Sequence, residues 1–406
     1  MTKKILFIQP YLQIGGVESV LITYLNAIVK LGKFKVELLV IDELEKFNIE
    51  KINPNIKVDF LLNEIEAQFG RYCFWKSSNI GSSEEDRRYF TSWRNHITEK
   101  AQQRLLNKIK EENFDAAIDF LNVFTRFLAK DNFIKHINIP VLAWIHDHFY
   151  FIDRLNEKEL SKNVLNEYSA IISICEDMRV KCQNFLSNDL GLYGKESQLL
   201  YNPIDIQKII DLSNESLSEN DEILLRNNYI VEVARLENGQ KNLLQLIDIY
   251  AKLKQKGIKE KLYIIGDGPS REEIAQKIKE LGLEENCLLL GAKLNPFPFM
   301  KNAKVFVHTA NYEGLPTVLI ESQICGTPVV AFNCPTGPRE ILADGKYGEL
   351  IPMGDEDLFV EKTYELLTNE EKRQHFISLL PQSYQRFSME KISEQFFQLI
   401  EDVTRK

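Results

Sequence analysis

Short apolar segments alternate with longer amphipathic ones along most of this chain. The first apolar segment covers residues 4–8 and leads into a loop that contains Gly15 and Gly16. An amphipathic stretch over 17–31 and a second apolar run at 36–41 follow. This order predicts a strand, a glycine loop, a helix and a second strand, which together form a βαβ unit. Repeated βαβ units build a parallel sheet with helices on both faces.

The alternation stops near residue 200 and then starts again. Its two series predict two Rossmann-like domains, residues 1–200 and 201–382, and a final helical segment at 383–406. The predicted fold class is α/β, with two parallel-sheet domains that face each other across a cleft. Ligands are expected in that cleft, since parallel sheets bind them at the carboxyl ends of their strands. Further strands are predicted at residues 116–120, 141–145, 170–174, 230–233, 262–265, 287–290, 305–308 and 329–332.

The charge and cysteine content exclude several classes of protein. The 50 Lys plus Arg against 59 Asp plus Glu give a net charge of -9, so the chain has no global basic field to hold a nucleic acid. The sequence contains no run of about 18 apolar residues, so it predicts no membrane span. Its first apolar run is shorter than the apolar region of a signal peptide. The six cysteines lack zinc-site spacing and indicate reduced thiols in a cytoplasmic protein. Any membrane contact is expected to be peripheral.

The segment after the predicted strand at 305–308 holds two glutamates, Glu313 on a loop and Glu321 inside a helix whose first turn contains Pro316. The positive amino terminus of that helix is predicted to hold a phosphate. A carboxylate beside a phosphate needs a neutral partner, and sugar hydroxyls are suitable donors, so the segment indicates a sugar phosphate. The alternative is that Glu313 is an ordinary loop carboxylate and Glu321 faces solvent. The backbone N–H groups predicted to bind the phosphate belong to Gly314, Leu315 and Thr317.

Two cations, Arg235 and Lys241, lie between a predicted strand end and a helix that begins near Asn242. Together with the dipole of that helix, they are expected to converge on the ligand. A departing nucleoside diphosphate develops negative charge that such cations stabilise. The alternative is that both are surface charges beside Glu232 and Glu237.

A second glycine loop, with Gly266 and Gly268, follows an apolar strand. It lacks the third glycine of a dinucleotide-binding fingerprint, and Arg271 follows it, so a dehydrogenase is not supported. The alternative is a plain turn between strand and helix.

The histidine His146 ends the predicted strand at 141–145 and could face the cleft, or it could be a buried structural residue. Neighbouring Asp147 and His148 raise the question of a metal. Consecutive strand residues alternate faces and cannot easily chelate one ion, so we expect a site without metal. We expect His148 and His308 to be structural.

The spacing of Glu313 and Glu321 resembles the signature of glycosyltransferase family 4, retaining enzymes with the GT-B fold. Arg235 and Lys241 resemble that family's phosphate-binding pair, and residues 202–205 resemble its interdomain segment. The two glycine loops also fit, in the expected order, with the weakest coverage at 45–110. The resemblance implies that the catalytic residues are His146, Arg235, Lys241 and Glu313. It implies that the donor is bound by Gly15, Gly16, Gly266, Gly268, Lys293, Gly314, Leu315, Pro316, Thr317 and Glu321, with Lys293 near the base and Glu321 on the ribose.

Three further segments are less specific. Residues 70–94 mix aromatic and basic side chains, which suits a lipid headgroup interface, a lipid-linked acceptor or ordinary packing. Residues 336–340 resemble a turn near the donor pocket. Residues 389–400 predict an amphipathic helix, which in GT-B enzymes crosses back onto the amino-terminal domain.

The resemblance predicts a retaining glycosyltransferase with no metal or other cofactor. It would move a sugar from a nucleotide-diphosphate donor, expected to be a UDP-sugar, to a hydroxyl of a glycan or lipid-linked glycan in cell-surface polysaccharide or glycoconjugate biosynthesis. We expect it in the cytoplasm, at the inner face of the membrane if it binds one. The alternatives are a nucleotide-sugar epimerase, a phosphorylase, and a non-catalytic partner that binds nucleotide sugars.

Overall fold

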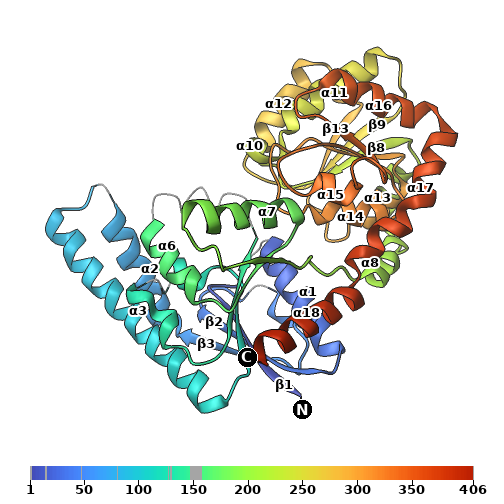
Figure 1. The fold of residues 1–406 in the computed structure, drawn as a ribbon. Coiled ribbons are helices and arrows are strands. Elements are labelled where there is room, and N and C mark those ends of the chain that lie inside the picture. Colours follow the sequence, from blue (N-terminus) through green and yellow to red (C-terminus); the bar gives the residue numbers. More distant parts are fainter. Residues whose placement is uncertain are drawn as a thin grey trace. The chain divides into compact units, whose positions relative to one another are not determined.

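The structure is a computed structural model that describes residues 2–13, 16–46, 48–79, 81–126, 128, 130–146 and 158–405. The chain divides into two compact units, shown in Figure 1, and each has its own parallel sheet. The predicted architecture of two parallel-sheet α/β domains is therefore confirmed. Unit 1 consists of Met1–Ile174, Met178–Pro203 and Met389–Lys406, and unit 2 consists of Cys175–Asp177 and Ile204–Ser388.

The sheet of unit 1 has seven strands in the order β3-β2-β1-β4-β5-β6-β7. Its central strands are continuous apolar runs because helices cover both of their faces. The order reverses beside β1, which pairs with both β2 and β4. The strands are β1 (Lys3–Gln9), β2 (Phe34–Asp42), β3 (Lys57–Leu62), β4 (Ala116–Asp119), β5 (Val141–Ile145), β6 (Ala170–Ser173) and β7 (Ser197–Leu199).

The last helix of the chain completes the core of unit 1. Helix α18 packs on α1, and the ring of Phe396 lies 6.0 Å from Phe7, 5.5 Å from Phe34 and 6.2 Å from Trp144. These aromatic contacts fix the end of the chain in unit 1. The helical segments of this unit are α1 (Gly16–Lys30), η1 (Ile49–Lys51), α2 (Glu64–Ser78), α3 (Glu84–Glu112), α4 (Val123–Arg126), η2 (Lys130–His136), α6 (Lys158–Glu167), α7 (Glu176–Asn184), η4 (Phe185–Asp189) and α18 (Met389–Thr404).

Helices α2 and α3 pack against each other as a hairpin at one end of unit 1 (Figure 1). Side chains of Asn63 and Ser83 cap their amino termini. The hairpin leaves large apolar side chains exposed to solvent. None of the helices in the described residues combines the length and apolar character needed to cross a membrane. The exposed side chains of the hairpin are Ile65, Phe69, Tyr72, Phe74, Trp75, Tyr89 and Trp93.

The sheet of unit 2 has six strands in the order β10-β9-β8-β11-β12-β13. They are β8 (Tyr229–Val233), β9 (Lys261–Ile265), β10 (Cys287–Gly291), β11 (Val305–His308), β12 (Val329–Phe332) and β13 (Glu349–Ile351). The helical segments are α8 (Ile206–Ser213), α9 (Glu219–Leu225), α10 (Asn238–Lys241), α11 (Leu243–Gln255), α12 (Arg271–Glu280), α13 (Phe297–Asn302), α14 (Thr317–Ile324), α15 (Pro338–Leu342), α16 (Glu356–Thr368), α17 (Glu370–Tyr384) and η5 (Gln385–Phe387).

The core of unit 2 lies between the sheet and the helices α11, α12 and α16, which pack together. Leu246 and Tyr250 of α11 and Phe359 of α16 are fully buried in it. Helices α8, α13 and α14 pack on one another in a separate layer. The central strands β8 and β11 lie within this packed unit, and their positions fix where the loops that follow them begin.

Candidate active site

The strand order of unit 2 reverses between β8 and β11, which are neighbours in the sheet. Such a reversal is where open α/β sheets bind ligands, beyond the carboxyl ends of the strands. Arg235 and Lys241 follow β8, and Glu313 follows β11. Three of the four predicted catalytic residues therefore come from the two strands that flank the reversal.

Lys241 and Glu313 contact each other directly. The Nζ atom of Lys241 lies 2.5 Å from Oε1 of Glu313, and both side chains are largely buried. Burial alone would raise the pKa of Glu313, but His308 and Lys241 lower it below its usual value. Glu313 is therefore ionised at neutral pH. The alternative of exposed, unconnected charges does not describe this pair.

Polar contacts hold the two loops together around that pair. The amide N–H of Asn311 donates to the carbonyl of Gln240 at 2.7 Å. The Thr309 hydroxyl donates to the carbonyls of Lys241 and Asn242, each at 3.2 Å. Sequence analysis assigned no role to Thr309 or Asn311, since a polar residue in a loop carries no signal of the partner that it contacts.

The guanidinium of Arg235 is exposed and forms no ion pair with any residue in the described ranges. It follows β8 by two residues, on the same loop that leads to Lys241. Among the described residues its charge is not neutralised by a partner, so it is available to an anionic ligand.

The two glycines of the 266–268 loop support the loop that carries Arg235. A Cβ at Gly266, where φ is +146°, would lie 1.8 Å from the carbonyl oxygen of Ala234, and one at Gly268 would lie 2.5 Å from that of Leu236. The N–H of Leu236 also donates to the carbonyl of Asp267 at 3.0 Å. The glycines are thus required for backbone packing. Their contact with a donor stays a prediction.

Helix α14 begins at Thr317, and no side chain caps its amino terminus. This leaves backbone N–H groups at the positive end of the helix dipole. Pro316 precedes the helix, and Gly314 and Leu315 connect it to Glu313. The predicted phosphate-binding segment is therefore a helix amino terminus, as its sequence suggested.

Residues 336–340 pack on this segment, and the last three of them begin helix α15, where the sequence predicted a turn. The Thr336 hydroxyl donates to the carbonyl of Glu313. Gly337 has a φ of +92°, and a Cβ there would lie 2.4 Å from Cδ of Pro316 and 2.7 Å from the carbonyl oxygen of Gly314. Sequence analysis assigned this segment no role beyond a turn. In the structure it holds the backbone of Glu313 and of the residues that follow it, Gly314 to Pro316.

Two other predicted donor-binding residues have defined surroundings. Glu321 lies within α14 and is half-buried; burial raises its pKa to about 7, while a hydrogen bond with Thr317 lowers it. The Nζ atom of Lys293 lies 2.6 Å from the carboxylate of Asp221. Lys293 is thus held by an ion pair, and a role beside the base stays a prediction.

The structure describes only some of the site residues predicted in unit 1. Gly15, Asp147 and His148 lie outside the described residues. Gly16 begins α1, and no atom of the described residues lies within 4 Å of the place where its Cβ would be. His146 is buried against the ring of Phe120, at a centroid distance of 4.5 Å, and burial lowers its pKa to about 3 although a backbone hydrogen bond with Phe120 raises it. It is a neutral imidazole at physiological pH.

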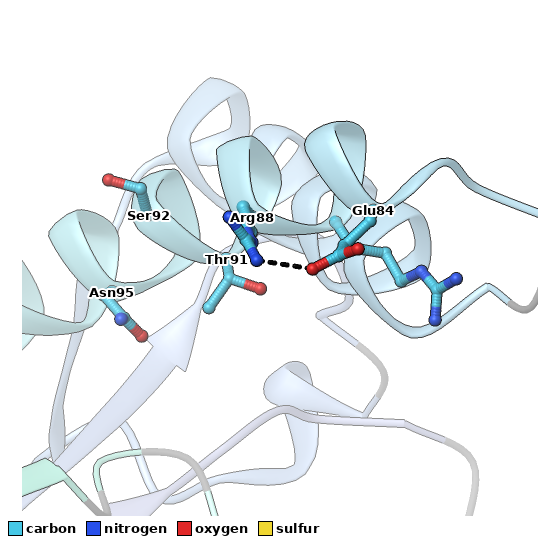
Figure 2. Close-up of a pocket in the computed structure, with 6 residues that line it drawn as sticks. Glu84, Arg88, Thr91, Ser92 and Asn95 are labelled. Carbon is cyan, nitrogen blue, oxygen red and sulfur yellow. Dashed lines mark hydrogen bonds and ion pairs between the residues drawn. The ribbon is translucent and has the colours of Figure 1, made fainter.

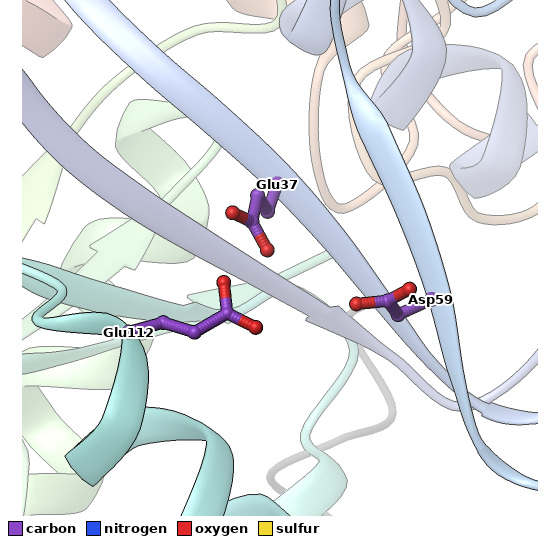
Figure 3. Close-up of side chains that lie close together, drawn as sticks. All are labelled: Glu37, Asp59 and Glu112. Carbon is purple, nitrogen blue, oxygen red and sulfur yellow. The ribbon is translucent and has the colours of Figure 1, made fainter.

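Three carboxylates, Glu37, Asp59 and Glu112, converge in unit 1 at a spacing that could hold a metal ion (Figure 3). The ammonium of Lys108 lies 3.0, 2.7 and 2.7 Å from them, and Lys4 lies 2.8 Å from Glu37. Because lysines already neutralise this cluster, it is an ion-pair network of the kind that joins strands to a helix.

A pocket on the outer side of α3 contains only residues of that helix (Figure 2). Its Arg88 is paired with Glu84 at 2.5 Å, one helical turn away. The pocket is therefore an open depression on the hairpin, distinct from the group around Glu313. It is lined by Glu84, Arg87, Arg88, Thr91, Ser92 and Asn95.

Residues 214–379 match the family model described as glycosyl transferases group 1. The chain is 33% identical over 191 residues to the N-acetylgalactosamine-N,N'-diacetylbacillosaminyl-diphospho-undecaprenol 4-alpha-N-acetylgalactosaminyltransferase of Campylobacter jejuni, covering 47% of this chain and 50% of that protein. It is 32% identical over 207 residues to the amylovoran biosynthesis glycosyltransferase AmsD of Erwinia amylovora, covering 49% of this chain and 58% of that protein. The chain thus spans about half the length of these curated relatives.

Among solved structures, Anabaena HepE in complex with UDP and glucose has a TM-score of 0.70 to this chain at 18% identity. The match covers 98% of this chain and 100% of that one. At this identity the likeness concerns the fold, and it confirms the predicted GT-B class.

Proposed function

We propose that this chain, whose residues 214–379 belong to the glycosyl transferases group 1 family, is a glycosyltransferase that uses a nucleotide-diphosphate sugar. The observation that carries the proposal is the buried pair of Lys241 and Glu313 at the reversal between β8 and β11. In this pair an ammonium, which suits a phosphate, and an ionised carboxylate, which suits sugar hydroxyls, lie within one hydrogen bond of each other. A sugar phosphate requires both at once.

Cleavage of the sugar–phosphate bond leaves a diphosphate whose charge must be stabilised. Lys241, Arg235 and the uncapped amino terminus of α14 supply positive charge for it. In this proposal the protein's own groups stabilise the leaving group, and no metal or other cofactor is needed. Glu313 binds a sugar hydroxyl, and Glu321 binds the ribose.

We propose UDP as the nucleotide and retention as the stereochemical outcome. The solved complex of HepE contains UDP, which supports the choice of nucleotide. The Campylobacter relative is named for an α-linked product. Common UDP-hexoses carry the sugar in the α configuration, so an α product from such a donor requires retention.

The proposed acceptor is a lipid-linked glycan in polysaccharide or glycoconjugate biosynthesis, bound at the cytoplasmic face of a membrane. The name of the Campylobacter relative includes a diphospho-undecaprenol acceptor. The α2–α3 hairpin supports a peripheral contact with the bilayer, because it exposes aromatic rings with basic groups over them: Lys76 lies over Trp75, and Arg94 over Phe74.

The test is a transfer assay with UDP-glucose, UDP-galactose, UDP-GlcNAc and UDP-GalNAc, each with and without an undecaprenyl-diphosphate-linked sugar. We expect acceptor-dependent release of UDP with one donor, and Lys241→Ala to reduce it by about 10²- to 10³-fold. Lys372→Ala removes a lysine that pairs with Glu349 and Glu365 and is the control.

An epimerase would convert the donor without acceptor, and a phosphorylase would need inorganic phosphate. A non-catalytic partner would bind UDP without turnover. Any of these results contradicts the proposal.

A further inference from the structure

Glu313 belongs to a longer chain of polar contacts inside unit 2. Its Oε1 atom lies 3.1 Å from Nε2 of His308, and Nδ1 of the same histidine lies 3.0 Å from Oε1 of Glu232. The side chains of Glu232 and His308 are each only 1% exposed. Glu232, His308, Glu313 and Lys241 therefore form one continuous row of contacts, in which two carboxylates alternate with an imidazole and an ammonium. The apolar strands around Glu232 and His308 make both side chains unusual, since each buries charge at a cost.

The geometry fixes the protonation state of His308. Each of its ring nitrogens faces a carboxylate oxygen, and a neutral imidazole has only one N–H to donate. An imidazolium donates to both Glu232 and Glu313. Burial alone would lower the pKa of His308, but the charges of Glu232 and Glu313 raise it to about 9.

Two further titratable groups of the described residues lie beside Glu313, on the segments that follow β8 and β12. Beyond Glu313 lie the ammonium of Lys241 and the thiol of Cys334, whose pKa is raised to about 12 by burial and by Glu313. The thiol is therefore neutral across the pH range in which His308 is charged. The charge on His308 depends on Glu232 and Glu313.

His308 and Lys241 both bind the Oε1 atom of Glu313. The Oε2 atom accepts no hydrogen bond from a residue of the described ranges, so it is left for a ligand. A diphosphate that draws Lys241 away leaves His308 as the cation that still holds Glu313.

We propose that His308 and Glu232 are positioning residues for sugar transfer: His308 holds Glu313 ionised and oriented while Lys241 binds phosphate, and Glu232 keeps His308 protonated. This inference rests on the proposed function. Neither residue touches the donor, and both act through Glu313. This positioning depends on one residue from each of two paired strands, Glu232 on β8 and His308 on β11.

The charge state can be measured without any substrate. In nitrogen-15 NMR of the full chain, the imidazole of His308 should be doubly protonated at pH 7.5 and lose a proton near pH 9. In Glu232→Gln this proton should be lost at least one pH unit lower. A neutral His308 at pH 7 in the wild type overturns the inference, whatever the outcome for transfer. The proposed function fails separately, if no UDP-sugar in the panel is turned over.

Kinetics test the positioning role, with whichever UDP-sugar the wild type turns over. Glu232→Gln should lower kcat at least tenfold at pH 8.5, leave the dissociation constant of UDP within threefold, and move the alkaline limb of the pH profile to lower pH. Glu232→Asp keeps the charge and should restore most of the profile. The control, Glu260→Gln, removes a carboxylate that pairs with Lys304 at 2.8 Å and should leave the profile unchanged.

Thermal unfolding of each variant separates loss of fold from loss of position. If Glu232→Gln does not fold, Glu232→Asp carries the test through a smaller shift of the same limb. An unchanged pH profile in folded Glu232→Gln, or in Glu232→Asp where the Gln variant does not fold, overturns the positioning role.

Discussion

The ammonium of Lys241 and the carboxylate of Glu313 are 2.5 Å apart, although 72 positions separate them in the sequence. A diphosphate that binds Lys241 must compete with this carboxylate. Under the proposed function, the two residues are therefore expected to have opposite effects on the affinity for nucleotide, although sugar transfer would need both.

Replacing each partner should separate nucleotide binding from transfer. Lys241→Ala should weaken UDP binding by about 1.5–3 kcal/mol, because a charge-assisted contact is lost. Glu313→Gln should keep or improve UDP binding, since it frees the ammonium, and should reduce transfer by about 10²- to 10³-fold. Calorimetric titration with UDP and the transfer assay measure the two effects. Equal loss of UDP affinity in both variants would contradict the competition.

Substituting Gly268 should disturb the loop that carries Arg235. An added Cβ would lie 2.5 Å from the Leu236 carbonyl oxygen, so Gly268→Ala should destabilise the protein by about 1–3 kcal/mol. Unfolding in urea measures the change. Gly194→Ala is the control, because nothing lies within 4 Å of a Cβ at that position. If both variants have the same free energy of unfolding, the loop accommodates the added methyl group and the prediction is wrong.

Removing the Phe396 ring should destabilise unit 1. The side chain is fully buried, and a change from Phe to Ala in a core costs about 3–5 kcal/mol. Because Trp144 is a neighbour of the ring, its fluorescence should report the transition in urea. Gln395→Ala changes an exposed residue of the same helix and should have little effect. The prediction fails if Phe396→Ala unfolds at the wild-type urea concentration.

The buried His146 should make stability depend on acidity. Its pKa is about 3 in the folded chain and about 6.5 when unfolded. Below pH 6.5 the unfolded chain binds a proton that the folded chain does not, so stability falls as pH falls from 6.5 toward 3. Between pH 7 and pH 5, wild type should lose about 2 kcal/mol more than His146→Asn. His375→Asn, at an exposed position, should behave like wild type.

The aromatic side chains of the α2–α3 hairpin should control binding to lipid. Changing Trp75 and Trp93 to Ser should reduce co-sedimentation with vesicles of phosphatidylglycerol and phosphatidylethanolamine at least fivefold, because these rings favour the bilayer interface. Leu294→Ser alters an apolar residue of unit 2 that is more exposed than either tryptophan and should leave binding intact. Equal sedimentation of all three proteins would exclude the hairpin as the contact.

The sequence predicted the central strands because these are buried on both faces and consist of apolar runs, as in Val305–His308. The strands it did not predict, β3, β7 and β13, are all at sheet edges. An edge strand has one neighbour and tolerates polar residues, as Lys57 and Asp59 show in β3. Helix α3 buries only three of its 29 residues, Ala101, Leu105 and Ile109, so its apolar stripe is confined to its carboxyl-terminal half.

The site residues, too, could be predicted only in part. Glu313, Lys241 and Arg235 were identified because their spacing resembles a known family. The link from Glu232 to His308 was not, since it depends on which strands become neighbours in the sheet. The signal for it is a charged or ionisable residue inside an apolar strand, and its partner is visible only once the fold is known.

Unit 1 is assembled from separate stretches of the chain, since Met389–Lys406 joins it after unit 2 has been completed. A gene cut after Pro203 would yield one fragment without the ring of Phe396 and another ending in a helix with an uncovered apolar side. Neither piece would be a self-sufficient domain. Chimaeras that exchange unit 1 between relatives therefore need two junctions, at 203/204 and at 388/389, with the terminal helix taken from the same parent as the first 203 residues.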